Sequence, residues 1–127
     1  MPNLPDGTVT FLYTDLEGST ALWERHPQAM QAAVARHDAL LRQAITTHRG
    51  HVFRAAGDGL CAAFAVAPDA VAAALAGQRA LHAEDWGEVG PLRARMALHT
   101  GAAEVHGGDY VGACRGRRSS GRGTRRW

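Results

Sequence analysis

Two acidic residues, Asp15 and Asp58, stand at positions where chemistry is possible. Asp15 ends the apolar and β-branched run TFLYT, and Asp58 lies between two glycines in AGDGL. If the strand before Asp15 pairs antiparallel with either strand beside Asp58, the two carboxylates lie side by side. Adjacent carboxylates repel each other and are tolerated mainly with a cation between them. Because carboxylates favour hard ions, the pattern predicts a site for Mg²⁺ or Mn²⁺.

The segment LEGST, residues 16–20, follows Asp15 directly and has the composition of an anion site. Gly18 lets the backbone approach a ligand closely, and we expect Ser19 or Thr20 to cap a helix that begins there. Backbone amides at a helix N-terminus bind anions. An acid pair beside such amides is the apparatus of phosphoryl transfer on a nucleotide. Taken singly, each motif is more often a plain helix cap or hairpin turn, and only their joint occurrence favours the functional reading.

The elements that must position these residues follow from the hydrophobic pattern. Alternation of apolar residues predicts strands, and a stripe with helical spacing predicts helices, with Pro27 restarting the first of them. We expect strands at 8–14, 51–55, 60–64 and 92–101, helices from 19, over 28–48 and over 69–83, a loop at 84–91, and a strand at 102–105 that pairs back before a turn at 106–110. This order predicts an α+β fold with helices on one face of a mostly antiparallel sheet.

Composition is that of one globular domain with an unusual charge distribution. The chain has 127 residues, 46% hydrophobic and 20% charged, and all 14 basic residues are arginine. Six arginines lie in the last sixteen positions, so the rest of the chain carries 8 − 12 = −4. We find no apolar segment long enough for a signal peptide or a membrane span, and the two cysteines form no ligand or redox motif. We therefore expect a cytoplasmic protein.

Three segments resemble the class III nucleotidyl cyclase domain, the catalytic unit of adenylate and guanylate cyclases. They are GTVTFLYTDLEGSTALWE, HVFRAAGDGLCAAF and LRARMALHTGAAEVHGGDYVG, and the resemblance covers residues 7 to 112. It implies a ferredoxin-like α/β sandwich that converts ATP or GTP to a 3′,5′-cyclic nucleotide and pyrophosphate. It also implies a head-to-tail dimer, either a homodimer or a heterodimer with another cyclase domain.

The resemblance assigns roles to the residues already singled out. Asp15, Asp58 and the Leu16 carbonyl would hold two divalent ions, Mg²⁺ or Mn²⁺. One ion would activate the ribose 3′-hydroxyl, and the other would neutralise charge on the phosphates and on the leaving pyrophosphate. The backbone amides of the LEGST segment would bind the triphosphate; the phosphate-binding residues are Glu17, Gly18, Ser19 and Thr20.

Two further residues match the positions that select the purine in this family. Arg54 lies four residues before Asp58, where adenylate cyclases typically have lysine, and Asp109 lies three residues before Gly112. Asp109 could accept a hydrogen bond from the adenine amino group, which favours ATP over GTP. Without the resemblance, Arg54 reads equally well as a surface charge of a strand and Asp109 as a turn acid.

The resemblance breaks after Gly112. Family members continue with an asparagine and an arginine that stabilise the transition state, and this chain has Gly116 and Ser120 at those positions. We therefore divide the chain into a partial cyclase domain, 1–112, incomplete at its C-terminus, and an Arg/Gly/Ser-rich tail, 113–127, which its composition predicts to be disordered. The absence of lysine suggests a GC-rich gene, and we hypothesise that the tail is a frameshift product.

These features lead to one main prediction and two alternatives. The main prediction is a metal-dependent cyclase domain that is inactive or strongly impaired as this chain. A cyclase-like module that binds nucleotide or metal without turnover, or that regulates a partner domain, is the first alternative. The second is binding of nucleic acid through the arginine-rich tail.

Overall fold

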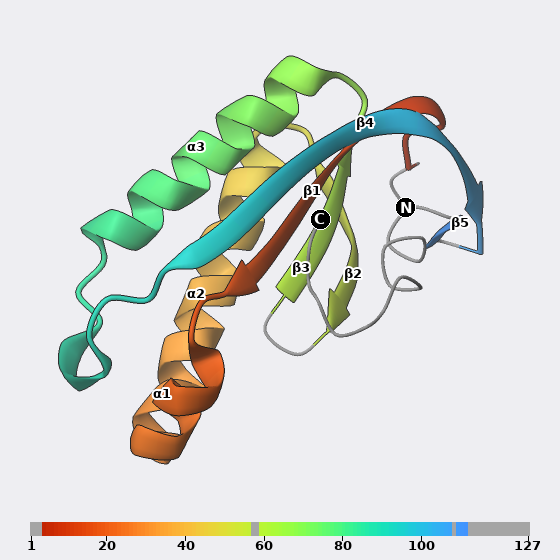
Figure 1. Ribbon diagram of the computed structural model, residues 1–127. Coiled ribbons are helices and arrows are strands. Elements are labelled where there is room, and N and C mark those ends of the chain that lie inside the picture. The colour runs from red at the N-terminus through yellow and green to blue at the C-terminus, as the bar shows by residue number, and fades with distance from the viewer. Residues whose placement is uncertain (1–3, 57–58, 108, 112–127) are drawn as a thin grey trace.

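The computed structural model describes residues 4–56, 59–107 and 109–111, and its elements follow the expected order. Figure 1 shows the chain coloured from one end to the other. The elements are β1 (Gly7–Leu16), α1 (Ser19–Arg25), α2 (Pro27–Thr47), β2 (His51–Ala56), β3 (Gly59–Phe64), α3 (Ala67–Ala83), the 3₁₀ helix η1 (Gly87–Val89), β4 (Ala94–His106) and β5 (Asp109–Val111). The tail at 113–127, and with it the expected end of the domain, lies outside the described residues.

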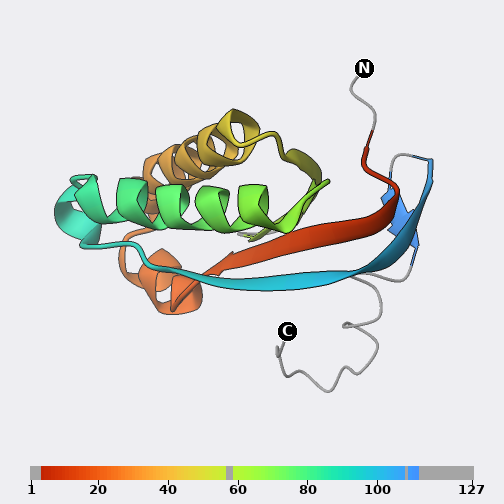
Figure 2. The ribbon, with the colours of Figure 1, turned by 90° about the horizontal axis from the view of Figure 1, so that it is seen from above.

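The strands form one antiparallel sheet in the order β2-β3-β1-β4-β5. The helices α2 and α3 lie side by side on one face of this sheet (Figure 2). Strands β1 to β4 with the intervening helices make a β-α-β-β-α-β unit, which is the ferredoxin-like arrangement. The expected α+β fold class is therefore confirmed.

The main core lies between the helices and the sheet. Leu12, Leu60 and Phe64 of the sheet pack against Leu41 and Ile45 of α2, and all five side chains are at most 2% exposed. Alanines of α3 complete the cluster, since small side chains let that helix approach the strands closely. No helix in the described part of the chain is both long and apolar enough to cross a membrane.

A second apolar cluster covers the opposite side of the sheet, which we call the second face. Alternate residues of β1 point there, namely Val9, Phe11 and Tyr13, and they pack against Phe53 and Tyr110. Because both faces of β1 are buried, its sequence reads as a nearly continuous apolar run. The second face is the side of the sheet on which the next acidic residue of β1 must lie.

Several predicted boundaries differ from the structure. The predicted turn at 106–110 contains the start of β5, and helix α3 and strand β4 begin at Ala67 and Ala94 where 69 and 92 were expected. Two further differences involve strand length. Asp15 does not end its strand, because β1 continues to Leu16. We expected one strand to end at Gly101 and a second to pair back at 102–105, but β4 is a single strand from Ala94 to His106. It stays paired with β1 as far as Ala103 and pairs with β5 beyond that point. The ten residues of β1 supply partners past Gly101, so the chain has no reason to turn there.

Candidate nucleotide and metal site

Asp15 lies on the second face and is held by an arginine of the neighbouring strand. The register of β1 and β4 places Asp15 opposite Arg95. The Arg95 Nε donates to Oδ1 of Asp15 at 2.9 Å, and the Arg95 Nη2 donates to Oδ2 at 2.8 Å. The Asp15 side chain is only 15% exposed, whereas that of Arg95 is 57% exposed. Both carboxylate oxygens of the first predicted metal ligand are thus engaged by one guanidinium.

The start of β3, one residue after the second predicted metal ligand, lies at the same end of the sheet. Thr14 of β1 pairs with Leu60 of β3, and the Leu60 amide also donates to the Thr14 hydroxyl at 3.3 Å. The start of β3 is therefore beside the end of β1 where Asp15 lies. Asp58 itself lies outside the described residues, so the pairing of the two acids stays a prediction.

The chemistry of Asp15 fits a cation site. Its carboxylate already accepts a cation in a two-pronged contact, and carboxylate and carbonyl oxygens are the donors that hard divalent ions prefer. Leu16, whose carbonyl is the predicted backbone ligand, is the last residue of β1 and has a buried side chain. Among the residues that the structure describes, no three His, Cys, Asp or Glu side chains gather into a metal-binding group. Asp58, the second predicted ligand, lies outside the described residues.

The turn after Asp15 differs in two details from the prediction. Gly18 has φ 65°, a left-handed conformation that favours glycine, and it forms the N-cap of α1 without any side-chain cap. Ser19 and Thr20 are the first residues of the helix, so the expectation that one of them caps it was wrong. The Glu17 amide donates to the Arg93 carbonyl at 2.8 Å and is not available to a phosphate, which corrects its predicted role. The amides of the first turn of α1 have no partner inside the helix, so they stay candidates for binding a phosphate.

The two predicted purine-selecting residues meet in the structure. Arg54 of β2 donates through Nη2 to Oδ2 of Asp109 in β5, although these strands are the two edges of the sheet. Figure 1 shows how: β4 arches across the molecule and curves at its far end, where β5 lies. The other oxygen of Asp109 accepts the Tyr110 amide at 2.8 Å. The Arg54 Nε is buried and has no hydrogen-bond partner in the described part of the chain.

A β-bulge in β2 sets the direction of the Arg54 side chain. Val52 pairs with Ala62 and Arg54 with Cys61, so Phe53 is an extra residue without a partner across the strands. Such a bulge turns neighbouring side chains to the same side of a sheet and often lies beside functional sites. Phe53 joins the aromatic cluster of the second face, and Arg54 lies next to it on the side where Asp109 approaches.

Tyr110 supports the position of Asp109 and was not singled out by the sequence. Its ring centroid lies 5.0 Å from that of Phe11 and 4.7 Å from that of Phe53, both in edge-to-face contact. Its hydroxyl donates to the Pro5 carbonyl at 2.6 Å. Burial of the phenol, together with the negative charge of Asp6, raises the pKa of Tyr110 from 10.0 to about 12. The hydroxyl therefore stays a donor over the whole physiological pH range.

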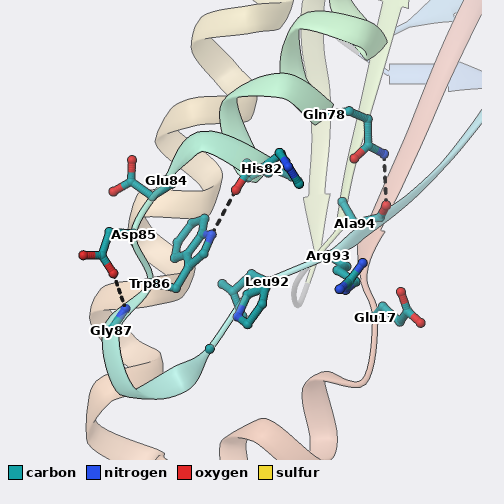
Figure 3. Close-up of a pocket in the computed structure, with 13 residues that line it drawn as sticks. Glu17, Gln78, His82, Glu84, Asp85, Trp86, Gly87, Leu92, Arg93 and Ala94 are labelled. Carbon is teal, nitrogen blue, oxygen red and sulfur yellow. Dashed lines mark hydrogen bonds between the residues drawn. The ribbon is translucent and has the colours of Figure 1, made fainter.

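A separate cavity of about 580 Å³ lies between α3, the loop that follows it and the start of β4 (Figure 3). The Trp86 indole donates to the Leu81 carbonyl at 3.0 Å, and the Gln78 amide donates to the Ala94 carbonyl at 3.1 Å. These bonds fix the loop against the helix. Glu17 and Arg93 also line the cavity, so it reaches the turn that follows Asp15.

Comparison with known proteins identifies the family. The family described as the adenylate and guanylate cyclase catalytic domain matches residues 1–106. The chain therefore belongs to this family, and the resemblance drawn from the three sequence segments is confirmed.

Several relatives extend well beyond the matching region. An uncharacterised protein of Mycobacterium tuberculosis is 43% identical over 110 residues, which are 85% of this chain and 36% of that protein. An adenylate cyclase of Schizosaccharomyces pombe is 33% identical over 82 residues, 65% of this chain and 5% of that protein. The chain thus spans about a third of the mycobacterial relative's length and much less of the yeast enzyme.

Solved structures agree on the fold. A structure from work on Trypanosoma brucei adenylate cyclases in their monomeric state superposes with a TM-score of 0.75 at 29% identity, covering 83% of this chain and 61% of the other. The guanylate cyclase domain of RhGC from Catenaria anguillulae, in complex with GTP, superposes with a TM-score of 0.68 at 18% identity, covering 80% of this chain and 61% of the other. The second likeness concerns the fold alone.

Proposed function

We propose that this chain is a nucleotidyl cyclase domain that binds ATP and Mg²⁺ or Mn²⁺ and forms 3′,5′-cyclic AMP and pyrophosphate within a dimer. Membership of the family supports the reaction class. The observation that carries the proposal is the second face itself, on which Asp15 and the Arg54–Asp109 pair both lie although they come from three different strands.

In this proposal each part of the chain has a separate task. The Asp15 carboxylate, the Leu16 carbonyl and Asp58 would hold the ions, which when bound lower the pKa of the ribose hydroxyl and neutralise the leaving pyrophosphate. The amides of Ser19 and Thr20 at the start of α1 would bind phosphate oxygens, because Gly18 turns the chain into the helix at that point.

The contacts of Asp109 support ATP over GTP. The Watson–Crick edge of adenine offers one acceptor and one amino donor, which match a donor of Arg54 and one oxygen of Asp109. Guanine presents a further donor on the same edge and would need a second acceptor. Each oxygen of Asp109 already accepts one hydrogen bond, Oδ2 from Arg54 and Oδ1 from the Tyr110 amide, so the carboxylate suits the single amino donor of adenine better than the two donors of guanine.

The proposal requires a partner chain for turnover. The positions of the transition-state asparagine and arginine, Gly116 and Ser120, lie outside the described residues, and neither glycine nor serine can replace those groups. A second cyclase domain that supplies them would complete the site, whereas a homodimer of this chain would not. Since the substrate is an intracellular nucleotide, we place this assembly in the cytoplasm.

A complementation assay tests the proposal. The purified chain is mixed with a cyclase domain that keeps its own transition-state asparagine and arginine but has its metal-binding acids replaced, and cyclic AMP is measured with Mn²⁺ and ATP. We expect product from the mixture, none above background from either chain alone, and none when this chain carries Asp15→Asn. Product from the chain alone would show that it needs no partner for turnover.

The sequence also favours a second candidate, a domain that binds nucleotide without turnover, because Gly116 and Ser120 replace the two transition-state residues. Thermal stabilisation by Mn²⁺ and ATP without product in any mixture would support it. Failure of both product and stabilisation would contradict the cyclase and the binding module together.

A further inference from the structure

We propose that Arg95 is an internal competitor for the cation at Asp15, so that its guanidinium lowers the affinity of the site for a free divalent ion. The inference rests on the proposed role of Asp15 as a metal ligand. It adds to the site a residue that neither the composition nor the motifs had indicated. It concerns which of two cations, the guanidinium or the divalent ion, binds the Asp15 carboxylate.

The geometry makes Arg95 a good occupant. Asp15 and Arg95 are direct partners in the β1–β4 ladder, so their side chains leave the sheet on the same face. The two N–H···O contacts of 2.9 and 2.8 Å form the fork that is among the stronger arrangements of arginine and carboxylate. The pair therefore resists other cations more than a single contact would.

The exposure of the two partners is unequal, and this allows exchange. The Asp15 side chain, one residue before the end of β1, is largely buried, while more than half of the Arg95 side chain is exposed. The guanidinium can leave toward solvent without opening the core. A divalent ion on the Asp15 oxygens would lie within a few ångströms of the guanidinium, and like charges at that distance repel strongly. Ion and guanidinium thus exclude each other.

A neighbouring arginine shows that the effect depends on position and provides a matched control. Arg93 lies two residues earlier, is exposed and carries the same charge, but only its carbonyl takes part in a hydrogen bond of the described structure, with the Glu17 amide. Removal of Arg93 changes the net charge of the chain as much as removal of Arg95 does. Only the latter frees the Asp15 oxygens.

The test is a titration of the full chain with Mn²⁺ in the absence of nucleotide, with free Mn²⁺ measured by its solution EPR signal. We expect Arg95→Gln to bind Mn²⁺ about fivefold more tightly than the wild-type chain, a change typical of an exposed ion pair, and Arg93→Gln to stay within about twofold. Asp15→Asn should remove this binding in every background. Circular dichroism verifies that each variant is folded.

The outcomes separate this inference from the proposed function. Equal affinities of Arg95→Gln and Arg93→Gln, with binding still lost in Asp15→Asn, would overturn the competition and leave the metal role of Asp15 intact. Binding that survives Asp15→Asn would overturn both.

A second measurement uses the wild-type chain and does not depend on the folding of Arg95→Gln. The ¹⁵N–¹H signal of the Arg95 Nε, assigned by its loss in Arg95→Lys, is followed while Mg²⁺ is added. We expect the signal to move toward that of a solvated arginine as Mg²⁺ saturates the site. A signal that keeps its position at saturation would show that ion and guanidinium share Asp15, and the inference would fall.

Discussion

The hydroxyl of Tyr110 links the end of β5 to the N-terminal lead-in of the chain. It donates to the Pro5 carbonyl at 2.6 Å, while the ring packs edge-to-face between Phe11 and Phe53. Only the neutral phenol can donate this bond, so the protonation state of a single residue affects how firmly two distant segments are joined.

Stability should therefore fall at alkaline pH because of Tyr110. Its folded-state pKa, about 12, lies above the value of about 10 expected in the unfolded chain, so its contribution is complete below pH 10 and is lost as the pH rises toward 12. We expect Tyr110→Phe to lower the free energy of unfolding by about 1 kcal/mol near neutral pH and to abolish this part of the alkaline loss. Urea unfolding at several pH values measures both. An alkaline loss of the same size in the variant would contradict the assignment.

Asp109 offers a second test at the scale of single residues. Asp109→Asn keeps an oxygen for the Tyr110 amide but loses the ion pair with Arg54. In that pair the Arg54 side chain is 36% exposed and the Asp109 side chain 41% exposed. We expect stability to fall by less than about 1 kcal/mol and ATP affinity, measured by calorimetry with Mn²⁺, to fall about tenfold. Glu88→Gln, an exposed acid of η1, is the control and should change neither quantity. A drop in stability without a drop in affinity would remove Asp109 from the purine site.

The sequence predicted the identity of several site residues but not their partners. Asp15 was singled out from its place after an apolar run, whereas Arg54 and Asp109 were singled out only through the resemblance to the cyclase family, since an arginine on a strand and an acid in a turn are ordinary surface residues. The contact of Arg95 with Asp15 depends on the register between two strands whose partners are 80 positions apart in the sequence, which the alternation of one strand does not reveal. The engagement of the Glu17 amide depends on the same register.

At the scale of elements, the junction between α2 and β2 depends on a glycine for steric reasons. A Cβ on Gly50 would lie 2.4 Å from the Phe64 ring and 2.7 Å from Ile45, both in the core. We expect Gly50→Ala to cost roughly 2 kcal/mol. Gly77→Ala in α3 is the matched control and should stay within about 1 kcal/mol of wild type, because the nearest atom is the flexible end of Leu41 and alanine favours the helix. Chemical unfolding of both variants distinguishes them, and equal losses would show that the Gly50 junction relaxes.

The elements themselves were predicted well where periodicity is strong and poorly where a glycine interrupts a strand. Helix α2 and the β2–β3 pair follow from apolar spacing and a glycine-rich turn. The full length of strand β4 was not predicted. Glycine is typical of turns, but Gly101 pairs with Val9 of β1 and is part of the strand. The bulge at Phe53 was equally hidden, since an extra residue leaves no mark on a strand of six.

For the molecule as a whole, binding of metal and nucleotide should be visible as stabilisation. At a concentration of Mn²⁺ and ATP roughly ten times Kd, we expect the melting temperature of the chain to rise by about 5 °C. Addition of EDTA should reverse the rise, and Asp15→Asn should show none. Differential scanning fluorimetry measures all three. Stabilisation that persists in EDTA would mean that the nucleotide binds without the metal site.

The fold class followed from the order of helices and strands, because few arrangements bury two helices against an antiparallel sheet. The curvature of β4, which brings β5 toward β2, did not follow from it. That contact joins residues 55 positions apart in sequence and at opposite edges of the sheet. A pattern of local propensities contains no information on such a closure.

The contact between Arg54 and Asp109 joins the two edge strands of the sheet, β2 and β5, through the same side chains that are proposed to bind the purine. Under the proposed function, replacing either one alone would remove the contact between the edge strands, with β5 still paired to β4, and would also alter which purine is accepted. A change of nucleotide preference that also keeps a contact between the edge strands would require substitutions at both positions 54 and 109. Substrate choice in this chain would then change only through coupled substitution of both residues.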